Sequence, residues 1–365
     1  MPNKHIFKSL KIIDLSSVLA GPSVGSFFAE LGADVLKIEN PNHPDITRFW
    51  KLPNEDKDSS VSAYFSSINY KKNYTELNLK DDSDRNQLLK KIEDVDIIIM
   101  NFKLGDQEKL KITDDILRTL NPKLIIGKIN GFGTDSDRVA YDLILQAESG
   151  IMAMNGTPES GPVKMPIALI DVLAAHHLKE GILIELLARS MDNNYIGRTI
   201  SVSLYDAAVS SLVNQASNYL MTNHVPQRIG SLHPNIAPYG ELFTTSDNKT
   251  ITFAIGSNTH FEKLCDFIKS PELASNEKFK AVQDRVVNRT ELHEILADKL
   301  QAYTSEEILT HMHKNHVPCG EVKNLDDVFK TEMAKDKIRT EEINGVKTKR
   351  VSGIAFITEE SVVLN

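Results

Sequence analysis

Short apolar runs alternate with helical segments through the first third of the chain, and this alternation constrains the fold more than any other feature. The apolar runs are rich in Ile, Val and Leu, as expected for strands that helices cover on both faces of a parallel sheet. We therefore predict an α/β fold whose large domain is Rossmann-like. The expected strands are 11–15, 34–39, 96–102, 123–129 and 199–204, and the expected helices are 22–31, 84–92 and 114–120.

Length and charge narrow the class of protein further. With 365 residues the chain exceeds what one hydrophobic core usually holds, so we expect two domains. The net charge of −8 disfavours non-specific binding of nucleic acid. The longest apolar runs, such as 97–100, are too short to span a membrane, and the first residues lack the apolar core of a signal peptide. We expect neither nucleic acid nor membrane as a partner.

The two cysteines, Cys265 and Cys319, indicate a reducing compartment, and we expect a cytoplasmic protein. Cys319 follows His311, His313 and His316 at spacings that a metal ion accepts. No second cluster of such ligands occurs elsewhere in the sequence, so we expect no metal site.

Gly21 and Gly25 follow the first expected strand, and Glu39 ends the next one, where a ribose-binding acid would lie. The G-x-G-x-x-G fingerprint of dinucleotide-binding folds is absent. We therefore expect a Rossmann-like shape without NAD. The two glycines are then explained by turn geometry and by close packing of helix on sheet.

Asp171 is a lone carboxylate in an apolar run, just before a long segment with helical spacing. It has two interpretations. As a helix N-cap it would stabilise the helix by about 0.5–2 kcal/mol. Alternatively it is a carboxylate nucleophile that is shielded from water and kept ionised by the N–H groups of a helix terminus. The local sequence alone favours the cap.

A series of short motifs in fixed order resembles the class III CoA-transferase family over most of the chain. Each motif is weak by itself, and the order gives the series its specificity. The motifs are Asp14-Leu-Ser-Ser-Val-Leu-Ala-Gly-Pro22, Leu31-Gly-Ala-Asp-Val-Leu-Lys-Ile-Glu39, Asp45-Ile-Thr-Arg48, Asn69-Tyr-Lys-Lys-Asn73, Leu77-Asn-Leu-Lys80, Asn101-Phe102, Gly131-Phe-Gly133, Tyr141-Asp142, Gln146-Ala-Glu-Ser-Gly150, Gly156, Gly161-Pro162 and His233-Pro-Asn-Ile-Ala-Pro-Tyr-Gly240.

The resemblance implies that Asp171 is the catalytic nucleophile, which reverses the preference for a cap. It implies an acyl-CoA thioester and a small carboxylic acid as substrates, with no metal and no permanently bound cofactor. The family's formyl-CoA transferases carry other residues where this chain has Ser17, Asn40 and Asn130, which leaves the two acids open. By family position, the residues expected to bind CoA are Ser17, Val18, Ala20, Leu77, Lys80, Asn101, Phe102 and Lys109.

Two other functions compete with CoA transfer. The related α-methylacyl-CoA racemases use a histidine in a Gly-His-Asp triplet, and this chain has Tyr141 at that place. Tyrosine, with a pKa of about 10, is a poor base at neutral pH. His176 and His177 are interpreted as ordinary helix histidines, so transfer is preferred over racemisation. A CoA-binding or oligomerisation protein without activity is the third possibility, and the retained Asp171 argues against it.

The resemblance also implies the domain organisation. Residues 1–205 would form the large CoA-binding domain, 206–229 a linking helix, 230–322 a smaller α/β domain, and 323–365 a segment that returns to the large domain. Gly256 has two interpretations, either a loop of the small domain that is able to cover the site or an ordinary turn at the end of a strand. The family implies an interlocked homodimer, in which the interface is obligate.

Overall fold

The computed structural model describes residues 6–357, which form two compact units. Within these residues, the first unit contains 6–152, 164–226 and 336–357, and the second contains 153–163 and 227–335. The chain therefore enters the second unit twice. It also keeps residues 323–335, which we expected to belong to the returning segment.

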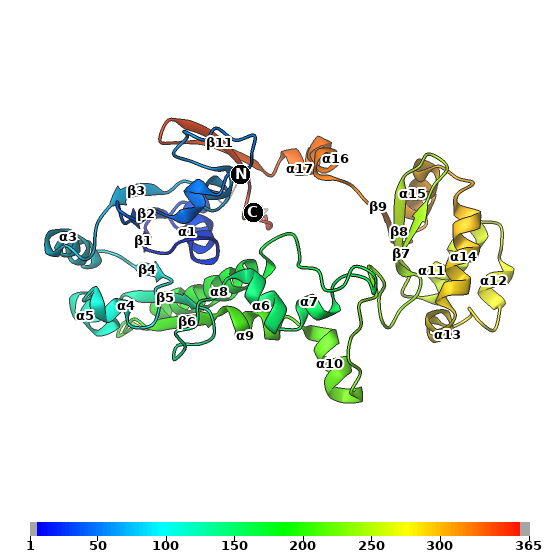
Figure 1. Ribbon diagram of the computed structural model, residues 1–365, viewed down its shortest axis with the longest axis horizontal. Helices are drawn as coiled ribbons and strands as arrows, with labels where there is room; N and C mark the ends of the chain where they lie inside the picture. Colours follow the sequence, from blue (N-terminus) through cyan, green and yellow to red (C-terminus); the bar gives the residue numbers. More distant parts are fainter. Residues whose placement is uncertain (1–5, 358–365) are drawn as a thin grey trace, which may run out of the picture. The chain divides into compact units, whose positions relative to one another are not determined.

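A six-stranded parallel sheet organises the first unit (Figure 1), and its strand order is β3-β2-β1-β4-β5-β6. The predicted strands are confirmed to within two residues at each end. Sequence analysis missed β3, because its Asn-Tyr-Thr-Glu run is short and largely polar. The strands are β1 (Lys11–Asp14), β2 (Asp34–Glu39), β3 (Asn73–Glu76), β4 (Ile97–Met100), β5 (Ile125–Asn130) and β6 (Thr199–Ser203).

Two separate apolar cores cover the two faces of this sheet. Side chains alternate along each strand, so Ile12 and Ile97 enter one core while Ile13 and Ile98 enter the other. Helices α1 (Ala20–Glu30) and α8 (Leu169–Met191) cover the first face, and α3 (Asp82–Ile92) and α5 (Asp114–Leu120) cover the second. The Rossmann-like α/β architecture is confirmed.

The expected linking helix is divided in the structure. Two helices, α9 (Leu204–Ser210) and α10 (Val213–Thr222), replace one continuous helix, and Val213 at the break has a φ of 35°. The remaining short helices of the first unit are η1 (Ile46–Phe49), α2 (Ala63–Ile68), α4 (Asp106–Lys109) and α6 (Asp142–Glu148), and α7 (Ile151–Met154) crosses the boundary between the units.

The end of the described chain returns to the first unit as an antiparallel hairpin, β10 (Ile338–Ile343) and β11 (Val346–Val351). Glu30, at the end of α1, has a side chain that is 7% exposed, and it anchors this hairpin through ion pairs with Arg339 at 3.2 Å and Arg350 at 3.1 Å. The last segment of the chain thus completes a unit that the first segment begins.

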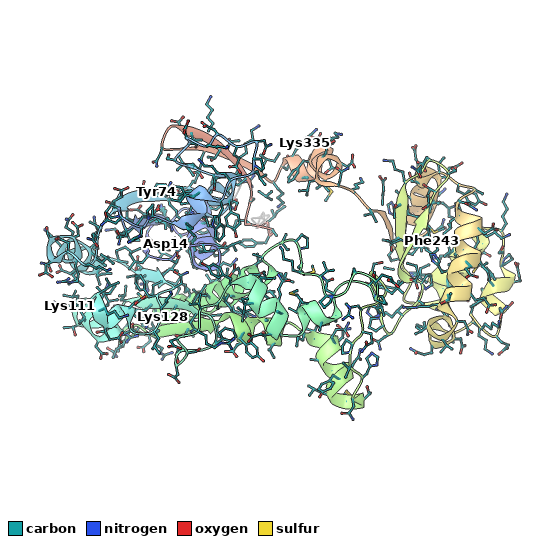
Figure 2. The ribbon with its side chains drawn as sticks, in the orientation of Figure 1. Asp14, Tyr74, Lys111, Lys128, Phe243 and Lys335 are labelled. Carbon is teal, nitrogen blue, oxygen red and sulfur yellow. The ribbon has the colours of Figure 1, made fainter. Side chains whose placement is uncertain are left out.

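The second unit has an antiparallel sheet of three strands and its own apolar core, which contains Phe243 (Figure 2). Gly256 lies between β8 and α11, and neither its φ nor its packing requires glycine. The elements of this unit are β7 (Tyr239–Thr244), β8 (Thr250–Ala254), α11 (Asn258–Phe267), α12 (Glu272–Ser275), α13 (Val282–Val287), α14 (Arg289–Leu300), α15 (Ser305–Lys314), β9 (Cys319–Glu321), α16 (Leu325–Lys330) and α17 (Glu332–Lys335).

Within residues 6–357, no helix combines the length and apolar character that a membrane crossing needs. Over the same residues, no three His, Cys, Asp or Glu side chains lie close enough to hold a metal ion. Cys265 and Cys319 are free thiols, and burial raises the pKa of Cys265 to about 12.

Candidate active site

The carboxyl ends of β1 and β4 mark the point where the chain changes direction across the large sheet. From β1 the strand order runs outward through β2 to β3, and from β4 it runs outward through β5 to β6. In open α/β sheets, ligands bind in the crevice outside the carboxyl ends of the strands at such a switch point. The loops that follow β1 and β4 are therefore the first candidates for a binding site.

The side-chain amide of Asn101 joins these two loops. Its Oδ1 accepts a hydrogen bond from the Ser17 N–H at 3.0 Å, and its Nδ2 donates to the Ser17 carbonyl at 2.9 Å. The Leu15 N–H also donates to the carbonyl of Ile99 in β4 at 2.8 Å. These three bonds fasten the loop after β1 to the end of β4, so the two loops form one continuous wall.

A cavity of about 360 Å³ opens beside this wall, entirely within the first unit. It brings together six of the nine residues that sequence analysis assigned to the site: Ser17, Val18, Ala20, Asn101, Phe102 and Asp171.

The other three residues of that set do not line the cavity. Leu77 is 4% exposed and belongs to the apolar core on the second face of the sheet. Lys80 is exposed, and the ammonium group of Lys109 pairs with Asp106 at 3.1 Å.

Three cationic side chains that line the cavity were missed from the sequence: Lys103, Lys128 and Arg138. Lys128 pairs with Asp114 at 2.7 Å, and Arg138 pairs with Glu148 at 2.7 Å. Within residues 6–357, the Lys103 ammonium group has no such partner. Lys103 could have been found from the sequence, because it directly follows the Asn101-Phe102 motif at the carboxyl end of a predicted strand.

Asp171 is the third residue of α8 and is 8% exposed. The N-cap of this helix is Ala168, so the interpretation of Asp171 as a cap is wrong. Asp142 from α6 takes the role of an N-cap side chain, because its Oδ1 accepts a hydrogen bond from the Ile170 N–H at 2.7 Å. The carboxylate of Asp171 itself accepts no hydrogen bond from any residue between 6 and 357.

Asp142 and Gln146 together fix the start of α8. The Gln146 amide donates to the second oxygen of Asp142, and its Oε1 accepts from the Met165 N–H at 2.7 Å. Gln146 is fully buried, so both of its hydrogen bonds are shielded from water. This network holds both the apolar segment before the helix and the first helical turn.

The surroundings of Asp171 oppose its negative charge. Burial raises the pKa of Asp171 to about 7, and the nearby carboxylate of Asp142 adds to the increase. Tyr64, on α2, was also missed from the sequence. Burial, followed by the charges of Asp171 and Asp142, raises the pKa of Tyr64 to about 12, so its hydroxyl remains protonated at neutral pH.

No histidine is among the residues that line the cavity. Tyr141 does line it, and its side chain is half exposed. His176 is exposed on α8, and His177 approaches Glu180 of the same helix. His233 belongs to the second unit, where its ring packs on Tyr239.

Comparison with known proteins identifies the family of the chain. Residues 7–360 match the model of CoA-transferase family III. The chain is 32% identical to the succinate–glutarate CoA-transferase of Agrobacterium fabrum, over 90% of this chain and 83% of that protein. It is 34% identical to the acetyl-CoA:oxalate CoA-transferase of Acetobacter aceti, over 87% and 80% of the two chains.

A solved structure supports the same assignment. The crystal structure of a CAIB/BAIF family protein from Brucella suis superposes with a TM-score of 0.82 at 31% identity, and covers 97% of this chain and 93% of that one. The chain therefore belongs to CoA-transferase family III, and its enzyme class is that of the CoA-transferases.

Proposed function

We propose that the chain moves CoA from an acyl-CoA thioester to a free carboxylic acid, with Asp171 as the nucleophile. One observation carries this proposal. Three carboxylates line the cavity, and Asp171 is the buried one, whereas Glu108 and Asp137 are exposed. A buried carboxylate without hydrogen-bond donors is poorly solvated, which favours its attack on a carbonyl carbon.

The first half of the reaction loads CoA onto the enzyme. A carboxylate oxygen of Asp171 attacks the thioester carbonyl, the C–S bond breaks, and CoA leaves as a thiolate. The product is a mixed anhydride between Asp171 and the donor acyl group. The thiolate then attacks the aspartyl carbonyl, releases the donor acid as a carboxylate and leaves an aspartyl-CoA thioester.

The second half repeats these steps in reverse with the acceptor acid. Its carboxylate attacks the aspartyl thioester and expels the thiolate, which forms a second mixed anhydride. The thiolate then attacks the acceptor carbonyl, giving the new acyl-CoA and free Asp171. No proton is gained or lost overall, and the carboxylate serves first as nucleophile and later as leaving group.

The start of α8 favours this chemistry in two ways. Asp171 has a pKa of about 7, so it is largely ionised only above neutral pH, and its basicity exceeds that of an ordinary aspartate. Within the described residues, the backbone N–H of Asp171 has no acceptor. It is one of the free donors of a helix N-terminus, which stabilise an oxyanion.

We further propose that the wall formed by Ser17, Val18, Ala20, Asn101 and Phe102 binds the nucleotide end of CoA. The ammonium group of Lys103 is proposed to pair with the phosphates of CoA. For Leu77, Lys80 and Lys109, the proposal of a role in CoA binding depends on the family resemblance alone, because none of them lines the cavity.

Dicarboxylic acids are the proposed substrates. The names of the relatives support this choice, since they include succinate, glutarate, oxalate and mesaconate. The proposal that no cofactor is permanently bound follows from the reaction itself, in which every bond is made or broken by Asp171, the thiolate and the two acids.

The homodimer and the cytoplasmic location remain proposals. Large apolar side chains on α8 and α10 are exposed in the single chain, among them Met191 at 80% and Met221 at 84%, which supports a partner subunit. The free thiols of Cys265 and Cys319 fit a reducing compartment. Light scattering coupled to size exclusion would measure the mass in solution, and a monomer at micromolar concentration would contradict the dimer.

A transfer assay tests the function directly. Succinyl-CoA is offered with glutarate, oxalate, mesaconate or a monocarboxylate control, and the new acyl-CoA is quantified. We expect transfer to at least one dicarboxylate, and a loss of about four orders of magnitude or more in Asp171→Asn. Near-normal transfer by Asp171→Asn would contradict the role of Asp171, while α-proton exchange without transfer would favour the racemase alternative.

A further inference from the structure

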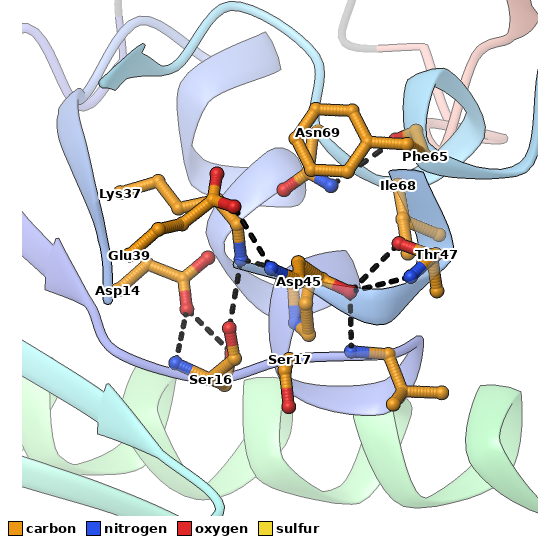
Figure 3. Close-up of polar contacts among 12 residues, drawn as sticks. Asp14, Ser16, Ser17, Lys37, Glu39, Asp45, Thr47, Phe65, Ile68 and Asn69 are labelled. Carbon is orange, nitrogen blue, oxygen red and sulfur yellow. Dashed lines mark hydrogen bonds and ion pairs between the residues drawn. The ribbon is translucent and has the colours of Figure 1, made fainter. Parts of the chain in front are cut away.

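Side chains, rather than other backbone groups, hold the backbone of the loop 16–18, which follows β1 (Figure 3). This arrangement replaces the hydrogen bonds that a strand or helix would supply. The bonds are Ser16 N–H to Asp14 at 2.9 Å, Lys37 to the Ser16 carbonyl at 2.7 Å, the Ser17–Asn101 pair described above, and Val18 N–H to Asp45 at 3.3 Å.

Val18 is the strained residue of this loop. Its φ is 72°, in the left-handed region that a β-branched side chain rarely adopts. Such a conformation persists only where the surrounding structure over-determines it, and it concentrates at ligand-binding sites. Since Val18 also lines the cavity, its conformation sets the shape of the wall that faces a ligand.

Asp45 is the group that holds the Val18 N–H. The same Oδ1 accepts from the Thr47 N–H at 3.1 Å and from the Thr47 hydroxyl at 2.8 Å, which fixes the carboxylate in place. Its other oxygen lies 3.2 Å from the Lys37 ammonium group (Figure 3). Both side chains are at most 1% exposed, and neither lines the cavity.

Lys37 bonds to the loop and to Asp45 at once. Its ammonium group donates to the Ser16 carbonyl and pairs with the carboxylate that holds Val18. A buried ion pair gives little net stability compared with apolar residues, but it fixes geometry because either charge alone is costly. The pair therefore determines one position of the loop.

We infer that Asp45, braced by Lys37, is a positioning residue that keeps Val18 in its left-handed conformation and thereby sets the affinity for the CoA nucleotide. The inference rests on the proposed function, in which this wall binds CoA. A loop that is held in its binding conformation before CoA arrives avoids the loss of affinity that a partly populated conformation brings.

The test compares Asp45→Ala in two backgrounds. Glycine adopts a positive φ readily and needs no side chain to hold it there. Free CoA is titrated by calorimetry into the full-length protein, so no acyl donor or acceptor acid is needed. We expect Asp45→Ala to raise the Kd by about tenfold in the native background and by less than about twofold in the Val18→Gly background.

The controls separate positioning from general damage. Glu30→Gln removes another buried ionic contact, at the far end of α1, and should leave the Kd within about twofold of the native value. If Asp45→Ala does not fold, Asp45→Asn takes its place. Lys37 would then attract the amide oxygen, and the amide nitrogen would face the Val18 N–H, so the same dependence on Val18→Gly is expected.

The outcomes distinguish the inference from the function that underlies it. Equal losses of affinity in both backgrounds, or no loss in either, would overturn the positioning role of Asp45 alone. Failure of the native protein to bind CoA would overturn the proposed function, and the inference with it.

Discussion

Two buried aspartates of the first unit, Asp14 and Asp171, differ in the ion-pair and hydrogen-bond partners that surround them. Beneath the loop after β1, Asp14 pairs with Lys72 at 2.7 Å, and its other oxygen accepts hydrogen bonds from Ser16. At the start of α8, Asp171 has no cation and accepts no hydrogen bond from the part of the chain that the structure describes. Both carboxylates lie in the same unit, and both are at most 8% exposed.

The contrast appears in the pKa values. Burial alone would raise the pKa of Asp14, but Lys72 and Lys37 outweigh it, and the pKa falls below the usual range. At Asp171 burial acts without such compensation, and the pKa rises to about 7. A buried charge with partners holds the structure together, whereas a buried charge without them is available for chemistry at the expense of stability.

The largest expected effect is on the partnered region. Asp14→Asn leaves the Lys72 ammonium group buried without its counter-ion, so we expect the free energy of unfolding to fall by about 3–5 kcal/mol at pH 7. The loss should diminish as the pH falls through the unfolded pKa of about 4 and the still lower folded pKa, because Asp14 itself becomes protonated there.

Urea unfolding measures this change. Asp94→Asn is the matched control, because Asp94 also pairs with a lysine but is 81% exposed. It should cost less than about 1 kcal/mol. Equal losses in the two variants would show that burial is not what makes the Asp14 pair matter.

Asp171→Asn should raise the free energy of unfolding, whereas Asp14→Asn lowers it. Because the folded pKa is raised, the folded state holds a proton that the unfolded state releases between about pH 4 and 7, and stability falls as the pH rises through that window. Asp171→Asn removes this penalty. We expect its gain in unfolding free energy over the native protein to be larger at pH 8 than at pH 5, by about 2–3 kcal/mol.

Unfolding curves at the two pH values decide this point. Asp137→Asn, at an exposed carboxylate that also lines the cavity, is the matched control. A difference between Asp171→Asn and the native protein that stays constant from pH 5 to 8 would mean that Asp171 titrates like an ordinary aspartate.

The next expected effect is on the rate of the first chemical step. Only ionised Asp171 attacks the thioester, so the rate of acyl-CoA consumption in a single turnover should rise about tenfold per pH unit below pH 7 and level off above it. Rapid chemical quench, followed by chromatography of the remaining acyl-CoA, measures this rate. A profile that is flat between pH 5 and 8 would contradict the raised pKa of the nucleophile.

The smallest expected effect concerns the cations around CoA. Lys103→Met should raise the Kd for CoA by about tenfold or less, because its ammonium group lines the cavity and has no ion-pair partner within residues 6–357. Lys80→Met and Lys109→Met should have smaller effects, and Lys91→Met on α3 serves as the control. A larger loss at Lys109 than at Lys103 would favour the assignment by family resemblance over the geometry of the cavity.

The fold was largely accessible from the sequence, because strands buried on both faces leave unbroken apolar runs such as 97–100. Motif order was enough to identify the family. The position of β3 was not accessible, since its four residues are partly exposed and polar. The break between α9 and α10 was missed as well, because it depends on the backbone at Val213 and not on a proline or glycine signal.

The site was accessible only in part, for a physical reason. Ser17, Asn101 and Asp171 lie at or next to the ends of predicted elements, where motif position assigned them to the site, and all three line the cavity. The cap of α8 comes from Asp142, which is 29 residues before Asp171 in the sequence and becomes its neighbour only through folding. The partners of Val18 are equally remote along the chain, and no local pattern identifies them.

Trapping of the covalent intermediate tests the central claim most directly. Native protein is incubated with succinyl-CoA without an acceptor acid, then treated with hydroxylamine or borohydride and digested with trypsin. Mass spectrometry should find a hydroxamate or an alcohol at Asp171 in the peptide Met165–Lys179, and none in Asp171→Asn. Protein that binds succinyl-CoA and leaves this peptide unmodified under both reagents would contradict the account.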